Sequence, residues 1–592
     1  MRIREVRISG FRSIPFCADI ETPDGAGVRT AKAVRIQWRR DAFRFQLPTG
    51  RSGGRSMLSA IIGANSAGKS TILLALDMAF GNTAKLDEAM FNGKQTDEPV
   101  IVEVTVQGEI ERPSQWHAEN CTLNGKTYAL TVAAVWTAAG RTRFIRRGDG
   151  LYAKQTARDR EQLAVLLPEF RIIWADSRLN DEANLEKKNL ISDLIDALLE
   201  QGQAQELSIV HRIDGLMREL QALVGRDNPA EPHLWQPVEE LEASLSRGLV
   251  SITPQRSRVC LNLDQNIPSL RSIFTRGVMS IDNGVELAFD QHGLGLQRSF
   301  VVSTLRTWCD LIRDAQKDYV FAIEEPEIYL HPHATRVLLN TLEELGRHDQ
   351  VIFTTHSSEF VNRAPLGNVL TVQRCDCDNR VASRVTRPSL GGLRADDLAK
   401  VQRYLQEDRS DMLFARAALL VEGQAELFAL PNFARTLGLD LDGNGVSVVF
   451  VNGLGNFYTY HHILRAFNIP HVILVDGDGK PRERLQEYRE AADAVYVLPQ
   501  DFEQALADAL SRERLLELMN ECLRRRGKPE RATAPVGKRA ASELAALGKP
   551  LVGRVAGDML TRAEVEQMAE IVGALTETAK AAALGTVGNT DR

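Results

Sequence analysis

Short, nearly continuous apolar runs recur along the chain, and each is followed directly by a glycine or an acidic residue. Three of these runs are Leu58–Ile62, Tyr319–Ile323 and Ala417–Val421. Runs of about five apolar residues without regular polar alternation are typical of strands buried on both faces of a parallel sheet. Because amphipathic helical patterns lie between the runs, the sequence predicts an α/β protein with parallel sheets.

A long helical pattern separates the first two of these runs. Residues 184–223 carry apolar side chains at i, i+3 and i+4 spacing, residues 224–229 interrupt the pattern, and residues 237–249 resume it. Charged residues interleave with the leucines, which is typical of helices that bury one stripe. Two interpretations stay open, a helical dimerisation arm and a helical layer packed on the sheet, because both would bury the same stripe.

The composition indicates a chain of several domains without a membrane span. The 592 residues are 44% hydrophobic and 25% charged, with a net charge of −6, so any DNA contact must come from local basic patches. The apolar runs are far shorter than the roughly 20 residues of a membrane-spanning helix. The seven cysteines are scattered, and the N-terminus alternates like a strand rather than a signal peptide. We therefore expect a cytoplasmic protein with reduced thiols and no membrane partner.

Residues 58–80 contain a nucleotide-binding motif. The run 58–62 leads into GANSAGKST, and an amphipathic helical pattern follows. This order matches the G-x-x-x-x-G-K-[ST] loop in its strand–loop–helix context. Glycines let backbone N–H groups turn towards phosphate oxygens, the lysine supplies a mobile cation, and the serine offers a hydroxyl to Mg²⁺. The motif predicts an ATP site formed by Gly63, Asn65, Gly68, Lys69, Ser70 and Thr71.

Two acidic residues at the end of a second apolar run would complete the ATP site. Glu324 and Glu325 directly follow Tyr319–Ile323. Glu324 would hold the Mg²⁺ shell, and Glu325 would orient or activate the attacking water. The alternative is an exposed acidic helix start, in which Pro326 would occupy a position near the first helical residue.

The order of further motifs resembles the ATPase heads of the ABC superfamily. The glycine-containing loop DQHGLGLQRSF (290–300) precedes the two acids, and His356 follows the run 351–355. The resemblance implies that Gly295 in one subunit closes on the γ-phosphate bound by another, so the heads dimerise. It also implies that His356 is the switch histidine; without that spacing, a buried core histidine is the simpler interpretation. The N-terminal MRIREVRISGFRSI resembles the start of recombination-type ABC ATPases.

A second set of acidic residues follows two later apolar runs. Glu422 and Glu426 come after Ala417–Val421, and Asp476 and Asp478 end the stretch VILVDGDGK. The carboxyl ends of parallel strands meet at one edge of a sheet, so we expect these four carboxylates to converge. Converging carboxylates repel one another unless cations lie among them, and oxygen-only ligands favour Mg²⁺ or Mn²⁺. Taken singly, the Asp-Gly pairs are also typical of a hairpin turn, and EGQAE of a helix cap.

The combination of motifs resembles the OLD (overcoming lysogenization defect) nuclease family, in which a Toprim domain follows a recombination-type ABC ATPase. The resemblance rests on GANSAGKST, IEEPE.YLHP, THSSEF, LLVEG..E and LVDGDG in this order. The family includes the nuclease subunit of Gabija defence systems. It implies that two divalent ions, Mg²⁺ with Mn²⁺ or Ca²⁺ as substitutes, straddle the scissile phosphate of DNA.

The same resemblance implies further site residues in the C-terminal part. Glu503 would be an additional metal ligand, with a helix N-terminal acid as the alternative. Lys549 would stabilise charge on the phosphate, and Lys538 is the rival lysine. The segment 504–554 is locally basic, as a DNA backbone contact surface should be, although solvated helix faces are also charged.

We therefore expect an ATP-binding, metal-dependent DNA endonuclease in phage defence or DNA processing. The expected catalytic residues are Glu325, His356, Glu422, Asp476 and Lys549, and the expected metal ligands are Ser70, Glu422, Glu426, Asp476, Asp478 and Glu503. The expected domains are an ATPase in two parts (1–180 and 251–390), a helical insertion for dimerisation (181–250) and a Toprim domain with a helical end (410–592). The expected partners are a second copy and, in some relatives, a UvrD-like helicase. The alternative function is an ATP-dependent DNA clamp or sensor that does not cleave DNA.

Overall fold

The structure of the protein is a computed structural model. The structure describes the chain except residues 24, 51–55, 82, 176–188, 196–235, 253–256, 263–277, 312–317, 378–379, 389, 391–409, 454–455, 478–485, 487, 490–491 and 585–592. The chain forms two compact units. The first contains residues 1–61 and 69–368, and the second contains residues 62–68 and 369–592.

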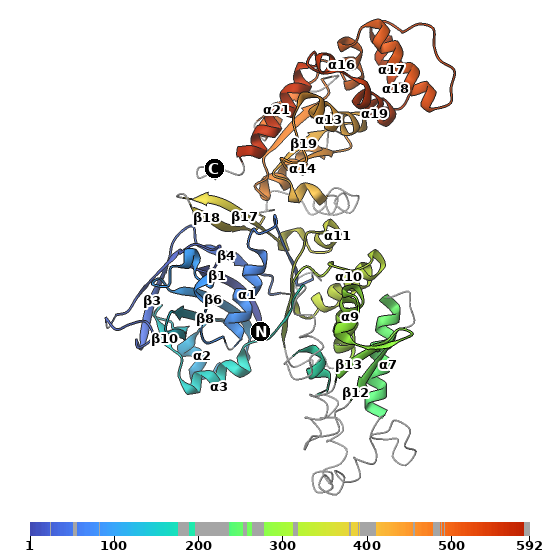
Figure 1. The fold of residues 1–592 in the computed structure, drawn as a ribbon. Coiled ribbons are helices and arrows are strands. Elements are labelled where there is room, and N and C mark those ends of the chain that lie inside the picture. Colours follow the sequence, from blue (N-terminus) through green and yellow to red (C-terminus); the bar gives the residue numbers. More distant parts are fainter. Residues whose placement is uncertain are drawn as a thin grey trace. The chain divides into compact units, whose positions relative to one another are not determined.

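An antiparallel sheet occupies the N-terminal part of the first unit (Figure 1). Its strands lie in the order β2-β3-β10-β9-β8-β6-β1-β4, and β7 pairs with β8. The strands are β1 (Arg2–Ser9), β2 (Ala18–Glu21), β3 (Ala33–Trp38), β4 (Phe43–Gln46), β6 (Val100–Glu109), β7 (Cys121–Asn124), β8 (Thr127–Thr137), β9 (Gly140–Arg146) and β10 (Tyr152–Lys154). The short helices of this part are η2 (Glu88–Met90), η3 (Asn92–Lys94), α2 (Gln115–Asn120) and α3 (Ala157–Leu166). The strand expected from the alternating N-terminus is confirmed by β1, in which Ile3, Val6 and Ile8 are fully buried.

Parallel strands carry the motifs of the expected ATP site. They lie in the order β11-β15-β16-β5 and pair in parallel. Their bounds are β5 (Leu58–Ile62), β11 (Glu169–Ile173), β15 (Tyr319–Ile323) and β16 (Gln350–Thr354), and the associated helices are α1 (Lys69–Phe80), α9 (Leu294–Leu311), α10 (Pro332–Gly346), α11 (Ser358–Val361) and η6 (Leu366–Asn368). Every residue of β5, β15 and β16 is buried, which explains why these strands read as apolar runs. The predicted α/β class is confirmed.

The end of the expected helical insertion packs within the first unit. Helix α7 (Gln236–Ile252) lies against α9, where the hydroxyl of Ser303 donates to the carbonyl of Leu245 at 2.7 Å. The carboxylate of Glu242 accepts the backbone N–H of Leu261, which joins α7 to a small sheet. That sheet contains β12 (Arg258–Asn262), β13 (Val278–Asp282) and β14 (Glu286–Ala288), followed by η5 (Phe289–Gln291). Helix α7 therefore packs on α9 and on this small sheet. Residues 196–235 of the expected arm lie outside the described residues, so the choice between a dimerisation arm and a layer on the parallel sheet stays a prediction.

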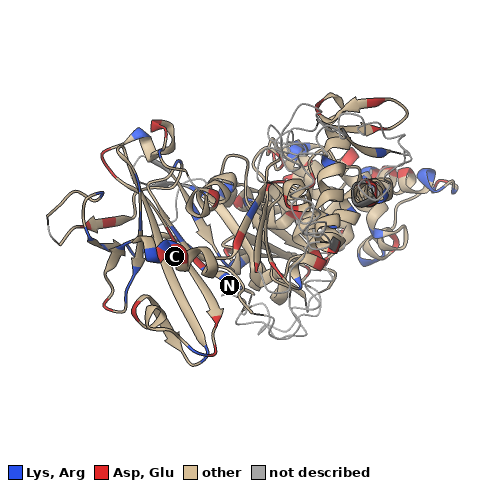
Figure 2. Ribbon diagram, turned by 90° about the horizontal axis from the view of Figure 1, so that it is seen from below, with Lys and Arg blue, Asp and Glu red and all other residues tan. Residues whose placement is uncertain are grey.

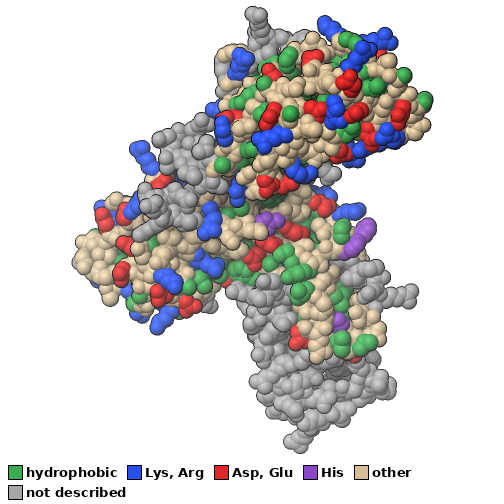
Figure 3. Space-filling model, turned by 45° about the horizontal axis from the view of Figure 1, so that its top comes forward, with side chains coloured by type: hydrophobic (Ala, Val, Ile, Leu, Met, Phe, Trp, Pro, Cys, Tyr) green, Lys and Arg blue, Asp and Glu red, His purple; other side chains and the backbone are tan. Residues whose placement is uncertain are grey.

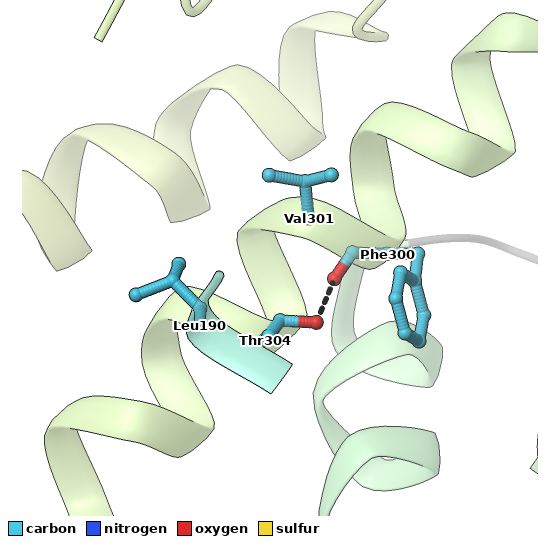
Figure 4. Close-up of a pocket in the computed structure, with 4 residues that line it drawn as sticks. All are labelled: Leu190, Phe300, Val301 and Thr304. Atoms are coloured by element: carbon cyan, nitrogen blue, oxygen red, sulfur yellow. Dashed lines mark hydrogen bonds between the residues drawn. The ribbon is translucent and has the colours of Figure 1, made fainter. Parts of the chain in front are cut away.

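A small apolar pocket lies beside α9, in the packing of the first unit (Figure 4). Its lining residues are Leu190, Phe300, Val301 and Thr304. The hydroxyl of Thr304 donates to the carbonyl of Phe300 at 3.0 Å, so the only side-chain polar group of this lining is already satisfied by its own helix. We therefore assign the pocket to packing rather than to ligand binding.

The second unit contains a hairpin and a four-stranded parallel sheet. The hairpin is β17 (Val369–Cys377) and β18 (Arg380–Thr386). The sheet has the order β20-β19-β21-β22, with β19 (Ala417–Val421), β20 (Val446–Phe450), β21 (His471–Val475) and β22 (Ala494–Val497). Because β21 pairs in parallel with both β19 and β22, the hairpin interpretation of the Asp-Gly pairs is wrong; a hairpin joins antiparallel strands.

Helices surround this parallel sheet and fix the segments that carry the acidic motifs. They are η7 (Ser410–Phe414), α13 (Gln424–Leu437), α14 (Phe457–Ala466), α16 (Phe502–Ala509), α17 (Arg512–Arg525), α18 (Lys538–Ala546), α19 (Lys549–Met559), α20 (Arg562–Val565) and α21 (Ala569–Leu584). Helices α13, α19 and α21 share one apolar core with the sheet (Figure 1), in which Phe433, Leu474, Val552 and Leu575 are buried. This packing holds the first turns of α13 and α19 in place. Within the described part of the chain, no helix combines the length and apolar character needed to cross a bilayer.

A buried histidine pair links α14 to β21 and predicts a pH-dependent stability. Nδ1 of His461 lies 2.8 Å from Nε2 of His471, and both side chains are buried. Burial, followed by the positive charges of His471, His462 and Arg465, lowers the pKa of His461 to about 4, although Asp493 opposes this. The unfolded chain therefore binds a proton below pH 6.5 that the folded chain does not bind until about pH 4. We expect a loss of about 3 kcal/mol of stability as the pH falls through this window.

Unfolding measured between pH 7 and pH 4.5 tests this expectation. A His461→Leu variant should show a weaker decline of the melting temperature than the wild type, and a variant of the exposed His333, His333→Leu, should not. Equal declines in all three proteins would contradict the role of the buried pair.

Candidate functional sites

The side chains of the expected ATP site meet beyond the carboxyl ends of β15 and β16. Lys69 begins α1, and its Nζ lies 2.6 Å from Nε2 of His356. The same Nε2 lies 3.3 Å from Oε1 of Glu325. His356 is about one third exposed, so it is not a core histidine. Burial, followed by the charge of Lys69, lowers the pKa of His356, which keeps its imidazole neutral and able to accept a hydrogen bond from the ammonium.

The two acids after β15 lie in a turn and not at the start of a helix. The backbone N–H of Glu325 donates to Oγ1 of Thr354 at 3.1 Å, and the φ of Glu325 is +38°. Glu324 accepts the N–H of Ala175 through Oε2 at 3.3 Å. Helix α10 begins only at Pro332, so the helix-start interpretation is wrong. The left-handed backbone at Glu325 turns the chain directly after the strand.

Two residues that the sequence pattern did not single out hold this site together. Oε1 of Glu327 accepts the hydroxyl of Thr355 at 2.7 Å and the N–H of His356 at 2.8 Å, which fixes the segment that carries the histidine. The guanidinium of Arg298 is almost fully buried and donates to the carbonyls of Trp174 and Glu324. Glu327 was visible in the motif EEPE, but nothing in the sequence showed that Arg298 would reach the acidic turn.

The predicted signature loop is shorter than expected, because α9 already begins at Leu294. Gly295 therefore lies in the first turn of a helix. The side-chain amide of Gln297 turns back and donates to the carbonyl of His292 at 2.8 Å, so it closes the loop instead of facing outward. The contact of Gly295 with a nucleotide held by another copy stays a prediction.

The backbone of the nucleotide-binding loop takes conformations that favour glycine. The φ of Gly68 is +112° and that of Gly63 is +152°, both in the region that residues with a Cβ avoid. Asn65 is exposed, whereas Ser70 and Thr71 lie in the first turn of α1. The loop thus leads into a helix N-terminus, the arrangement that binds phosphate through backbone N–H groups.

The acidic residues of the second unit lie at the carboxyl edge of its parallel sheet. Glu422 directly follows β19, and Asp476 directly follows β21. Val421 pairs with Leu474 on the neighbouring strand. Asp476 therefore lies one residue further along its strand than the position level with Glu422. Glu426 lies in the first turn of α13. Asp478 lies outside the described residues.

Two later elements, α16 and α19, bring Glu503 and Lys549 to this edge of the sheet. We call the group formed by Glu426, Asp476, Glu503 and Lys549 the carboxylate cluster. Glu503 lies in the first turn of α16, where Asp501 is the residue that caps the helix. Lys549 begins α19, and its Nζ lies 3.4 Å from Oε2 of Glu503. Lys538, the rival lysine, begins α18 and is exposed.

The carboxylate cluster is strongly buried for a group of three acids. The exposed fractions are 3% for Glu426, 9% for Asp476 and 0% for Glu503. Burial, followed by the charge of Asp476, raises the pKa of Glu426 to about 8, and burial raises the pKa of Glu503. Burial lowers the pKa of Lys549, but the neighbouring carboxylates, led by Glu503, outweigh it and raise that pKa. The raised pKa values of Glu426 and Glu503 mean that Lys549 alone does not make the ionised form of all three acids favourable.

The donor atoms of the cluster fit a divalent cation. Oε1 of Glu503 is buried and has no hydrogen-bond partner in the described part of the chain. A Cβ at Gly423 would lie 2.4 Å from Oε2 of Glu426, so the glycine leaves room for that carboxylate. All donors are carboxylate oxygens, which favour Mg²⁺ or Mn²⁺. Among the described residues, no group of three His, Cys, Asp or Glu side chains stands at the spacing of metal ligands.

Gly477 brings the segment after β21 close to the segment after β22. A Cβ at this position would lie 2.1 Å from the carbonyl oxygen of Leu498. Its N–H donates to the carbonyl of Gln500 at 2.6 Å. Any larger residue would push the two segments apart and displace Asp476, which directly precedes it.

Most of the arginines in the segment expected to contact DNA are paired with acids of the same unit. The ion pairs in this region are Arg514–Glu517, Arg514–Glu564, Arg524–Glu521, Arg524–Glu530, Arg525–Glu521, Arg525–Asp558, Arg531–Glu543 and Arg539–Glu543. Basic and acidic positions alternate along the ribbon (Figure 2), and both signs of charge are interspersed on the face seen in the space-filling view (Figure 3). The local excess of basic residues in 504–554 is therefore not a continuous positive surface.

Arg526 differs from the two arginines before it. It is exposed and forms no ion pair with a described residue. A Cβ at Gly548 would lie 2.6 Å from its Nη2, so the guanidinium lies against the residue that precedes Lys549. The φ of Gly548 is +95°, which also favours glycine. Arg526 is thus an accessible cation beside the residue that precedes Lys549.

Two known protein families match different parts of the chain, one the part with the ATP-site motifs and the other the part with the later acidic motifs. Residues 58–362, more than half of the chain, match the family model "AAA domain, putative AbiEii toxin, Type IV TA system". Residues 413–478 match the model "Overcoming lysogenization defect protein-like, TOPRIM domain". The second match ends at Asp478, so Glu503 and Lys549 lie beyond it.

Several curated proteins are similar to parts of the chain. The OLD nuclease of Thermus scotoductus is 32% identical over 208 residues, which cover 34% of this chain and 38% of that protein. The Old nuclease of Escherichia phage P2 is 23% identical over 469 residues, which cover 73% and 75%. Endonuclease GajA of Bacillus cereus is 25% identical over 172 residues, which cover 28% of each chain. The chain thus spans less than half of the Thermus relative that it matches. With both family models matched in this order, the chain belongs to the OLD nuclease family, with an AAA-type ATPase domain followed by an OLD-like Toprim domain.

Proposed function

We propose that the protein is an ATP-regulated, divalent-metal-dependent DNA endonuclease. The observation that carries this proposal is the carboxylate cluster, in which three buried acids face one lysine. Burying acids is costly unless cations compensate them. DNA binding alone would instead require exposed positive groups. The relatives named as nucleases support the same activity.

Each group of the cluster has a role in this proposal, and so have Glu422 and Asp478, which lie outside the cluster as defined above. Glu422, Glu426, Asp476, Asp478 and Glu503 would hold the divalent cations. When bound, these ions would activate a water molecule and stabilise the leaving oxygen of a phosphodiester. Lys549, half exposed beside Glu503, would lie against the phosphate and balance the charge that develops there. The raised pKa of Glu426 means that this residue holds a proton near neutral pH until a positive charge replaces it.

The ATPase domain would control access to the nuclease. Lys69 would contact the phosphates, Ser70 and Glu324 the Mg²⁺ shell, and Glu325 and His356 the attacking water. Gly295 of a second copy would complete the site in an ATP-bound homodimer. We further propose that the protein acts in the cytoplasm in phage defence and that a helicase of the UvrD type is its partner.

Cleavage of supercoiled plasmid tests the proposed function. The wild-type protein, with Mg²⁺, Mn²⁺ or Ca²⁺ and with or without ATP, should convert the plasmid to nicked or linear forms, and EDTA should stop the reaction. ATP should change the rate in a direction that the assay determines, and the change should disappear in Lys69→Ala. Retained DNA binding without cleavage under any of these ions would overturn the proposal in favour of an ATP-dependent clamp or sensor.

Arg526 is expected to contribute to DNA binding at the cluster. An unpaired guanidinium next to Lys549 can hold a phosphate through two hydrogen bonds. We expect Arg526→Ala to raise the KM for DNA about tenfold and to reduce the slope of log K against log salt concentration by about 1. Arg539→Ala is the matched control, because Arg539 is exposed and pairs with Glu543. Equal effects of the two substitutions would contradict a specific role of Arg526.

A further inference from the structure

The hairpin β17–β18 touches the nucleotide-binding loop at both ends of the loop. A Cβ at Gly63 would lie 2.1 Å from the carbonyl oxygen of Val372 in β17. The hydroxyl of Ser383 in β18 donates to the carbonyl of Ala67 at 2.6 Å. Ser383 is 4% exposed and Ala67 is fully buried. The loop and the hairpin are therefore in direct contact although more than 300 residues separate them in the chain.

The two contacts come from paired strands and so share one rigid support. Val372 pairs with Val385, two residues after Ser383, in the antiparallel register of the hairpin. An antiparallel pair fixes the distance between its strands through the ladder of backbone hydrogen bonds. The hairpin therefore supports the loop at Gly63 and at Ala67 from one pair of strands, in addition to the loop's own hydrogen bond from the N–H of Ala67 to the carbonyl of Ala64.

The hydrogen bond from Ser383 also determines where the next backbone N–H points. In a planar trans peptide, the C=O of one residue and the N–H of the following residue point in opposite directions. When Ser383 holds the carbonyl of Ala67 on the hairpin side, the N–H of Gly68 faces away from the hairpin. Gly68, with φ at +112°, then continues into α1. The N–H of this second motif glycine is one of the groups that the loop offers to phosphate.

We propose that Ser383 is a positioning residue of the ATP site, and that the hairpin β17–β18 is the template that holds the loop ready for phosphate. Ser383 belongs to none of the nucleotide-binding motifs and contacts the nucleotide only through the Ala67–Gly68 peptide. Without its hydroxyl, the carbonyl of Ala67 loses a buried hydrogen bond, and the peptide becomes free to rotate. ATP must then order this peptide when it binds, and the free energy used for that ordering weakens the binding.

Nucleotide binding to the purified full-length chain tests this role. Binding of Mg·ATPγS is measured by calorimetry, together with the KM and kcat of ATP hydrolysis and the melting temperature. Ser383→Ala is expected to bind the analogue roughly fivefold more weakly, as the loss of one hydrogen bond predicts. The KM for ATP should rise by a similar factor, while kcat stays within about twofold. Ser383→Thr keeps the hydroxyl and should bind ATP like the wild type.

Ser303→Ala is the matched control, because the hydroxyl of Ser303 is also buried and donates to a backbone carbonyl, that of Leu245. It should lower the melting temperature by as much as Ser383→Ala without weakening nucleotide binding. Wild-type affinity in Ser383→Ala would overturn the proposal. So would an equal loss of affinity in Ser303→Ala, or a folded Ser383→Thr protein that binds as weakly as Ser383→Ala. None of these readouts depends on DNA cleavage.

Discussion

Replacing Asp476 by asparagine is expected to lower the rate of DNA cleavage about 10³-fold, within the range of electrostatic and acid–base contributions to catalysis. Asp476 directly follows β21, is 9% exposed and lies close enough to Glu426 to raise the pKa of that residue. Asparagine keeps the shape of the side chain but removes its charge, so cation binding is weakened without a cavity. Initial rates of plasmid nicking at saturating Mg²⁺ measure the effect.

The control for Asp476→Asn is Asp442→Asn, which removes an exposed acid from the same unit. This control should cleave DNA at the wild-type rate, and both variants should hydrolyse ATP at the wild-type rate. If Asp476→Asn retained cleavage, or if Asp442→Asn lost it equally, the carboxylate cluster would not be the nuclease site.

Replacing Glu325 by glutamine is expected to lower the rate of ATP hydrolysis about 10²- to 10³-fold while ATP still binds. Its carboxylate lies 3.3 Å from Nε2 of His356, and that nitrogen lies 2.6 Å from Nζ of Lys69. Glutamine fills the same space, but it cannot accept a proton from the attacking water. Phosphate release and nucleotide binding, measured on the same preparation, separate the loss of chemistry from the loss of affinity.

Glu359→Gln, at an exposed position in α11, is the control for Glu325→Gln and should hydrolyse ATP normally. A contradictory result would be normal hydrolysis by Glu325→Gln together with a large loss in Glu324→Gln. That result would assign the attacking water to Glu324 and the Mg²⁺ shell to Glu325, the reverse of the roles proposed above.

The sequence predicted the strands of both sites well, because each is buried on both faces. The bounds predicted for Leu58–Ile62, Tyr319–Ile323 and Ala417–Val421 agree with β5, β15 and β19. Buried strands leave an unbroken apolar run, and the residue after each run necessarily lies at the carboxyl edge. The α/β class followed from these runs, and the family followed from the resemblance of the motifs, in their order along the chain, to a known family.

Contacts between distant segments could not be predicted in the same way. Arg298 donates to the carbonyl of Trp174, and Ser383 donates to that of Ala67. The acceptor in both cases is a backbone carbonyl, which every residue has, so no residue type marks it in the sequence. The start of α9 at Leu294 was missed for a related reason, since two nearby glycines indicate a loop even where helical hydrogen bonds form.

Charge was the least predictable property of the C-terminal part. The count of arginines in 504–554 indicated a DNA-binding surface, but ion pairs such as Arg514–Glu564 neutralise most of them. Only the fold showed that Arg526 lies beside Gly548 while Arg525 pairs with Asp558. Adjacent residues at the end of a helix point in different directions, and composition does not record those directions.

Binding of Mn²⁺ to the full-length chain, measured by electron paramagnetic resonance without nucleotide, tests most directly whether the carboxylate cluster is the metal centre. The wild type and Ser70→Ala should bind Mn²⁺ with the same affinity, because the hydroxyl of Ser70 serves the ATP site. Asp476→Asn should lose this binding. Equal Mn²⁺ binding by the wild type and Asp476→Asn would contradict the assignment of the cluster as the site of metal-dependent DNA cleavage.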